Sequence, residues 1–167
     1  DGPRFRVLCD DGAAFVRRSG EPFDVLLVDA FDRAGQPEDT CTLAFYDACR
    51  ARLGAGGVLV ANLYADDGAL AGRLERVRAA FDGRIVAVRA DESENLIVFA
   101  GADAPFPPPF RDLVARLRAL EQTHPVGLDA AMRKLLAQGE SQPARRRARS
   151  GRTQRAARDA HQGRARS

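Results

Sequence analysis

Short apolar runs alternate with longer amphipathic stretches along the chain, and this alternation predicts the secondary structure. Five runs have the length and the β-rich composition of strands, namely residues 5–9, 23–31, 57–64, 84–90 and 95–101. The second run, "FDVLLVDAF", is almost continuously apolar, which is typical of a central strand covered on both faces of its sheet.

The segments between these runs carry helical patterns. A short helix is predicted from "AAFVRR" at residues 13–18, and longer ones over residues 42–53 and 66–81, where apolar residues recur at helical spacing. "GAGG" at residues 54–57 is expected to end the second helix. Two further amphipathic helices are predicted at residues 111–122 and 127–138.

The order β-α-β-α-β-α-β-β predicts an α/β fold. Strands separated by helices imply right-handed crossovers and a mainly parallel sheet. The polar link "DESE" between the last two strands is too short for a crossover, so these strands should form an antiparallel hairpin. This is the outline of a Rossmann-like domain of the class I methyltransferase type.

Composition divides the chain into three parts. Residues 1–104 read as a partial Rossmann-like catalytic domain, and residues 105–138 as a proline-rich connector with two short helices. From Gly139 onward there are nine arginines against two acidic residues, while the rest of the chain holds 17 basic and 21 acidic residues. The tail, residues 139–167, is therefore expected to be disordered, and the basic pI belongs to it rather than to the body.

Several protein classes are disfavoured by the composition. There is no apolar run of about 18 residues, so no membrane span is expected. The three cysteines form no C-x-x-C pair, which favours reduced thiols in a cytoplasmic protein, and two histidines make a metal site unexpected. The chain starts Asp1-Gly2, without an initiator methionine or a secretory signal, and is expected to be a fragment or a processed product.

Acidic residues follow the first two predicted strands, where an open parallel sheet binds its ligands. They are Asp10 and Asp11 after the first strand, and Asp29 and Asp32 after the second, while Asn62 lies near the end of the third. A carboxylate there can hold a cationic substrate or take its proton. Structural uses remain open, because Asp11 can cap the helix that follows and Asp32 can shape a turn.

The series "DDGAAFV", "FDVLLVDAFD", "FYDACRARLGAGGVLVANL" and "NLIVFAG" resembles the spermidine synthase family, the polyamine aminopropyltransferases, over roughly residues 3–101. The resemblance implies that Asp11 binds the adenine amino group of the nucleoside and that Gly12 lets the backbone approach the base. It implies that Asp29 orients and deprotonates the attacking amine, and that Asp32 helps to hold the polyamine.

The same resemblance implies decarboxylated S-adenosylmethionine as co-substrate, with no tightly bound cofactor. The acceptor would be a polyamine, since carboxylates suit a polycationic acceptor and a sulfonium. No membrane partner is expected, and both a homodimer and a nucleic-acid contact of the arginine-rich tail stay open. Other S-adenosylmethionine-dependent transferases and a non-catalytic Rossmann-like binding module are the alternatives.

The sequence also departs from the family pattern. Arg33 stands where the family has proline, which should weaken or change acceptor binding. The glycine-rich loop and the acidic ribose-binding residue of the family have no counterpart, since "GAGG" lies between a helix and a strand. The chain therefore resembles the C-terminal portion of such an enzyme, and is expected to be inactive by itself.

Overall fold

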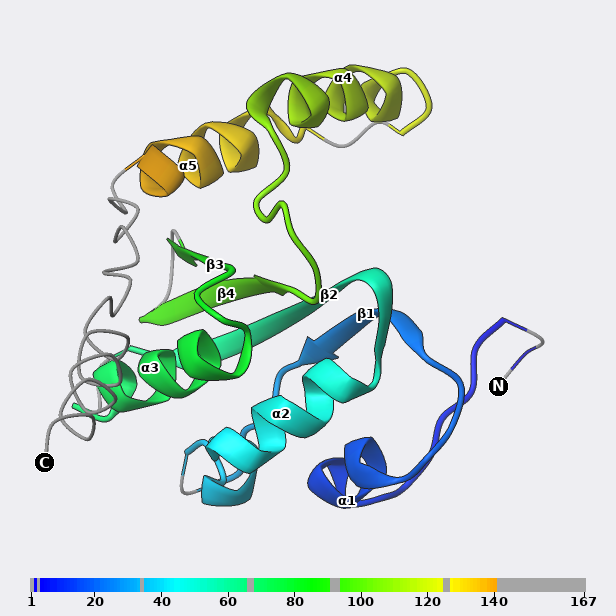
Figure 1. The fold of residues 1–167 in the computed structure, drawn as a ribbon, viewed down its shortest axis with the longest axis vertical. Helices are drawn as coiled ribbons and strands as arrows, with labels where there is room; N and C mark the ends of the chain where they lie inside the picture. Colours follow the sequence, from blue (N-terminus) through cyan, green and yellow to red (C-terminus); the bar gives the residue numbers. More distant parts are fainter. Residues whose placement is uncertain are drawn as a thin grey trace, which may run out of the picture.

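The fold was obtained as a computed structural model that describes residues 2, 4–33, 35–65, 68–90, 94–124 and 127–140. Helices and strands follow one another along the chain as in Figure 1, in the order α1 (Gly12–Arg17), β1 (Phe23–Val28), the 3-10 helix η1 (Glu38–Thr40), α2 (Leu43–Ala51), β2 (Leu53–Tyr64), α3 (Leu70–Ala80), β3 (Ile85–Arg89), β4 (Asn95–Gly101), α4 (Phe110–Glu121) and α5 (Asp129–Glu140). None of these described helices is both long and apolar enough to cross a bilayer.

One mixed sheet organises the α/β fold, with strand order β1-β2-β4-β3. β1 and β2 pair in parallel, with Val25 opposite Val58 and Val28 opposite Ala61. β4 pairs antiparallel with both β2 and β3, so β1, β2 and β3 point the same way and β4 alone points back. The predicted α/β class and its closing antiparallel hairpin are confirmed.

The core lies between one face of the sheet and the helices α1, α2 and α3, which lie on the same side of it in Figure 1. Side chains of this face are almost completely buried, including Leu59 at 0%, Val98 at 0% and Leu63 at 1% exposure. Thr42 caps the start of α2, because its Oγ1 accepts a hydrogen bond from the Phe45 backbone N–H at 3.1 Å. Burial raises the pKa of the Cys49 thiol on this helix to about 12.

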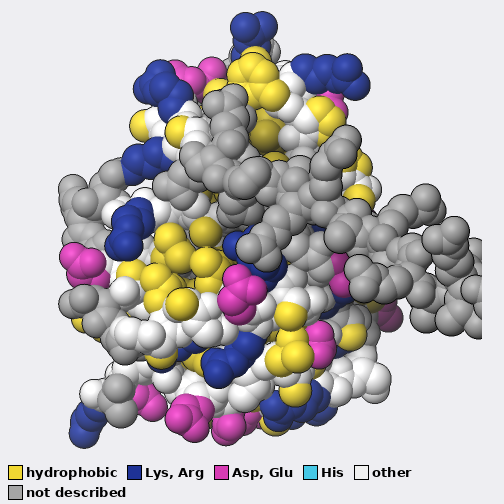
Figure 2. Space-filling view, turned by 60° about the vertical axis from the view of Figure 1, so that its left-hand side comes forward, with side chains coloured by type: hydrophobic (Ala, Val, Ile, Leu, Met, Phe, Trp, Pro, Cys, Tyr) yellow, Lys and Arg dark blue, Asp and Glu magenta, His cyan; other side chains and the backbone are white. Residues whose placement is uncertain are grey.

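The opposite face of the sheet is covered unevenly. At β3, which α5 contacts, Val86 is 3% exposed, but Val25 and Leu27 on β1 are 54% and 76% exposed. Figure 2 shows hydrophobic side chains gathered at the surface on one side of the molecule. The expectation that β1 is central and covered on both faces is therefore not met, because no described element lies over its outer face.

The expected first strand, residues 5–9, is not formed. Phe5 pairs only with Gly2 in an isolated bridge, and the segment that follows has no regular structure. Phe5, Val7 and Leu8 are 68%, 65% and 58% exposed. A strand needs a neighbour for its backbone groups, and the sheet built from the described residues has none beside this segment.

The glycines of "GAGG" lie inside β2 rather than between a helix and a strand. The register of the β1–β2 pair shifts between Phe23 and Val25, so the glycines form an irregular start to the strand. At Gly57 an added Cβ would lie 2.9 Å from the Gly54 carbonyl oxygen and 3.0 Å from that of Phe23, so the backbones approach closely here. The two predicted C-terminal helices are confirmed as α4 and α5. The predicted boundary of the tail at Gly139 is wrong, because Gly139 and Glu140 belong to α5, and the rest of the predicted tail lies outside the described residues.

Candidate functional site

The candidate site begins where β1 ends. Asp29 is the first residue after the strand, and its side chain is exposed to solvent. Its Oδ1 accepts a hydrogen bond of 3.0 Å from the side-chain amide of Asn62, which lies on β2. The parallel pairing of β1 and β2 brings these two residues, 33 positions apart, to the same edge of the sheet.

Asn62 has a second polar atom at this place. Its Oδ1 is buried, and no hydrogen-bond donor reaches it among the residues that the structure describes. A donor from outside would reach this oxygen only after a local rearrangement, because the atom has almost no exposed surface. The sequence placed Asn62 at a strand end but assigned it no role, because its partner is fixed by strand pairing.

Asp32 begins a tight turn in the segment between β1 and η1, which also holds Asp29 and which we call the acidic loop. Its backbone N–H donates to the Gly35 carbonyl at 2.8 Å, and the Gly35 N–H donates back to the Asp32 carbonyl at 3.3 Å. Gly35 has a φ of +117°, a conformation that a residue with a Cβ rarely adopts. Asp32 thus shapes a turn, as the structural alternative predicted, and its side chain is exposed three residues after Asp29.

Gln36 was missed by the sequence reasoning. Its Nε2 donates to the Asn62 carbonyl oxygen at 2.8 Å, and its Oε1 accepts from the Tyr64 backbone N–H at 3.1 Å. These two bonds return the chain to β2 directly after the Asp32 turn. No local sequence pattern predicts these bonds, since both partners lie more than 25 residues away.

Asp11 and Gly12 lie in the helix layer, at the start of α1. The Asp11 Oδ1 accepts from the Ala14 backbone N–H at 2.6 Å and caps the helix, which confirms the structural alternative for this residue. Gly12 is the first helical residue, and a Cβ added there would meet open space. α1 contacts η1, which follows the acidic loop, but none of the described hydrogen bonds links Asp11 to Asp29.

Asp10 is held by a charged partner. Its carboxylate forms a salt bridge with Arg18 and also accepts from the Asp11 backbone N–H at 2.9 Å. The hydrogen bond from Arg18 lowers the pKa of Asp10 below its ordinary value. Asp10 and Asp11 are therefore both engaged by groups within eight residues of them.

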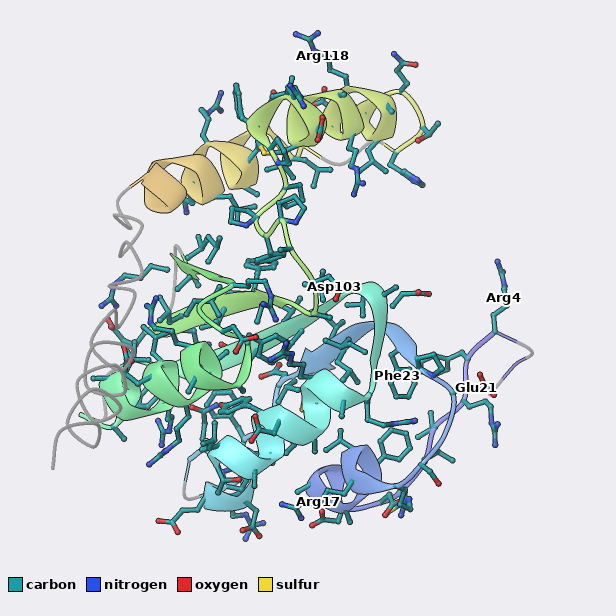
Figure 3. The ribbon with its side chains drawn as sticks, viewed as in Figure 1. Arg4, Arg17, Glu21, Phe23, Asp103 and Arg118 are labelled. Carbon is teal, nitrogen blue, oxygen red and sulfur yellow. The ribbon has the colours of Figure 1, made fainter. Side chains whose placement is uncertain are left out.

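Asp29 and Asp32 are open to solvent, and two hollows of the described surface lie elsewhere. One, of about 350 Å³, lies between η1 and α3 and is lined by Glu38, Thr42 and Arg76 among others. The other, of about 320 Å³, lies by Asp103, whose carboxylate accepts from the Gly56 N–H at 2.9 Å and which Figure 3 labels. Neither hollow is lined by the acidic residues after β1.

Comparison with known proteins identifies relatives of the N-terminal part of the chain. Residues 1–64 match the spermine/spermidine synthase domain. The polyamine aminopropyltransferase of Escherichia coli is 43% identical over 61 residues, which cover 36% of this chain and 21% of that enzyme. The chain thus matches about a fifth of the length of the relative.

Solved structures agree with this match. The chain is similar to a probable spermidine synthase from Corynebacterium glutamicum, with a TM-score of 0.53 and 25% identity over 64% of this chain and 41% of that one. It is also similar to a spermidine synthase in complex with the transition-state analogue AdoDATO, with a TM-score of 0.53 and 29% identity over 62% of this chain and 38% of that one.

Human methyltransferase-like protein 13 shares the fold, with a TM-score of 0.65 at 21% identity over 75% of this chain and 63% of that one. The Rossmann-like class is therefore confirmed. The resemblance to the spermidine synthase family is also confirmed, and it lies in the N-terminal part of the chain.

Proposed function

We propose that the chain carries the amine-binding side of an aminopropyltransferase site. Asp29 takes the proton of the attacking amine, and Asp32 holds a second positive charge of the polyamine. The observation that carries this proposal is the Asp29 carboxylate, exposed at the end of a strand that runs parallel to its neighbour and oriented by Asn62 at 3.0 Å.

The chemistry needs a base at this place. An alkyl ammonium group has a pKa of about 10 and is not a nucleophile until it loses a proton. Asp29 accepts that proton, and the amine lone pair then attacks the carbon next to the sulfonium of decarboxylated S-adenosylmethionine. A C–N bond forms, the C–S bond breaks, and its electron pair leaves on sulfur as a neutral thioether.

The nucleoside side of the proposal rests on Asp11 and Gly12. The helix cap uses Oδ1 of Asp11, and an ionised carboxylate has further lone pairs for the adenine amino group. Capping and nucleoside binding are therefore compatible in one residue. The space beside Gly12 leaves its backbone open to approach by a planar base.

The match covers 21% of the Escherichia coli enzyme, so we assign to this chain only a part of the active site. The 167 residues are not expected to turn over by themselves, because the family's glycine-rich backbone cradle for the nucleoside has no counterpart in them. Transfer is expected in a cytoplasmic enzyme that supplies the rest of the pocket. Arg33 beside Asp32 should weaken the binding of a polycationic acceptor.

A chimera tests this function directly. The 61 residues of the Escherichia coli polyamine aminopropyltransferase that match this chain are replaced by their counterparts from it. The chimera is assayed with decarboxylated S-adenosylmethionine and putrescine, and the thioether and spermidine products are measured. Its folding is checked by thermal unfolding against the parent enzyme, and the unaltered 167-residue chain is assayed in parallel.

We expect the chimera to form both products and the chain alone to form neither. A chimera that unfolds cooperatively near the parent temperature, yet releases no thioether, would show that this chain's acidic loop does not support aminopropyl transfer. Turnover by the 167-residue chain alone would show that these residues form a working nucleoside pocket. The proposal that the rest of the pocket must be supplied from elsewhere would then be wrong.

A further inference from the structure

The Gln36 side chain occupies an unusual position between the acidic loop and β2. It is half-buried and makes two hydrogen bonds to the main chain of β2, donating to the Asn62 carbonyl at 2.8 Å and accepting from the Tyr64 N–H at 3.1 Å. Both partners lie at the end of β2, one and three residues beyond Ala61, the last residue of β2 that pairs with β1.

These bonds have the pattern of a parallel β-ladder. In such a ladder a residue donates to the carbonyl before its partner and accepts from the N–H after it. The β1–β2 pairing stops with Val28 opposite Ala61. Alternate residues of a strand bond to the same neighbour, so the next residue to bond to β2 would be two positions on, at Ala30, and would face Leu63. Asn62 and Tyr64 flank Leu63, and the Gln36 amide therefore replaces the N–H and C=O of one strand residue.

This replacement lets β1 end early while β2 keeps its hydrogen bonds. The chain from Asp29 to Gly35 leaves the sheet, turns back at Asp32, and is tied down again at Gln36. Asn62 contacts both ends of this loop, with its side chain on Asp29 at 3.0 Å and its carbonyl on Gln36. The loop that carries both carboxylates is thus tied to one strand at Asp29 and at Gln36.

We propose that Gln36 is a positioning residue, which sets the place of Asp29 and Asp32 by completing the β2 ladder with its side chain. The positioning follows from the hydrogen bonds alone. Its consequence for an amine ligand rests on the proposed function. Gln36 touches no reacting atom and acts through Asn62 and the loop.

The test compares Gln36→Glu and Gln36→Ala in the full chain. The glutamate keeps the size and the acceptor for Tyr64 but has no donor for the Asn62 carbonyl. The alanine removes both bonds. Gln122→Glu is the matched control, because Gln122 is an exposed residue at the end of α4 and the change in charge is the same.

The first readout needs no ligand. The NMR signals of the Asn62 side-chain NH₂ report its bond to Asp29, and they should shift in both Gln36 variants and stay in place in the control. The thermal midpoint is measured on the same samples. Unmoved Asn62 signals in a folded Gln36→Ala chain would overturn the positioning role.

The second readout is the affinity for putrescine, measured by titration. Gln36→Ala should weaken binding about tenfold, as expected when bonds that place charged groups are lost. Asp29→Asn combined with Gln36→Ala should bind no more weakly than Asp29→Asn alone, because both changes disable the same loop. Additive losses would mean that Gln36 acts independently of Asp29, which would also overturn the proposal.

The two readouts separate this inference from the proposed function. If the unaltered chain does not bind putrescine but the Asn62 signals move in the Gln36 variants, the amine site fails and the positioning stands. If putrescine binds and the signals do not move, the positioning fails and the amine site stands.

Discussion

Two pairs of aspartates follow two apolar segments of this chain, and they are used differently. Asp10 and Asp11 are engaged by neighbours in sequence, Arg18 and the first turn of α1. Asp29 is engaged by Asn62, 33 residues away on another strand, and Asp32 opens a turn that Gln36 ties to that same strand. The first pair mainly builds a helix start, whereas the second is presented to solvent by the sheet.

The difference lies in what orients each carboxylate. A cap or a local salt bridge forms wherever the helix forms, and it needs no further fold. The Asp29–Asn62 bond exists only when β1 and β2 pair in the correct register, because a shift by one residue would turn Asn62 to the other face. A carboxylate that depends on the sheet for its orientation is the better candidate for chemistry.

The largest effect should come from Asp29→Asn in the chimeric enzyme. The amide keeps the size and can still bond to Asn62, but it cannot take a proton. Turnover should fall by about 10²- to 10⁴-fold, the usual span for general acid–base catalysis. Nucleoside affinity should change little, because Asp11 is assigned to the adenine.

Stability separates a catalytic role of Asp29 from a purely structural one. Because the side chain is exposed, the thermal midpoint of Asp29→Asn should stay close to that of the unaltered protein. Turnover, nucleoside binding and thermal unfolding are measured on one sample. Normal turnover in a folded variant would remove Asp29 from the mechanism and make the two aspartate pairs alike.

A smaller effect is expected at the helix cap, where two substitutions of Asp11 differ. Asp11→Ala removes the acceptor for the Ala14 N–H and should lower the free energy of unfolding by about 1 kcal/mol. Asp11→Asn is also a good cap and should lower it less. Urea unfolding of both variants measures this difference.

The affinity for the nucleoside tests whether Asp11 has a binding role in addition to its capping role. If Asp11 also binds adenine, Asp11→Asn in the chimera should weaken nucleoside binding although the helix is intact. Unchanged affinity in a stably folded Asp11→Asn protein would leave the residue with its capping role alone.

The smallest expected effect is the pH dependence of the stability that the Asp10–Arg18 salt bridge provides. Its pKa is lowered in the fold by Arg18, so the pair adds stability above the ordinary carboxyl pKa and loses it as the pH falls through the lowered value. Arg18→Gln should lower the thermal midpoint slightly at neutral pH, and the difference should vanish once the pH falls below the lowered pKa of Asp10. A difference that does not depend on pH would indicate lost packing of Arg18, which also lies over the Phe15 ring.

Much of the fold could be predicted from periodicity. The run at β1, the helical stripe of α2 and the hairpin of β3 and β4 are each readable locally, and each is confirmed. Residues 5–9 have the same strand-like composition, yet they form none. Strand formation depends on a partner for the backbone, and composition does not say whether the partner is there.

The candidate site was predictable in part. Asp29 and Asp32 could be found because they follow an apolar run, and the Asp11 cap because a carboxylate precedes a short helix. The roles of Asn62 and Gln36 could not, since each depends on a register between segments far apart in sequence. The prediction that "GAGG" ends a helix was wrong for a related reason. An irregular start to a strand depends on how the strand pairs with its neighbour, which the local sequence does not show.

The position of β1 has a consequence for handling the protein. It is the edge strand of the described sheet, it carries a single charge, Asp24, and its exposed Val25 and Leu27 add an apolar surface to that edge. Natural edges are usually guarded by lysine, proline or a covering element, and an unguarded edge templates intermolecular pairing. Purified chain should therefore stay dispersed only when dilute, and its solubility limit, rather than its thermal midpoint, should decide how long a sample remains usable.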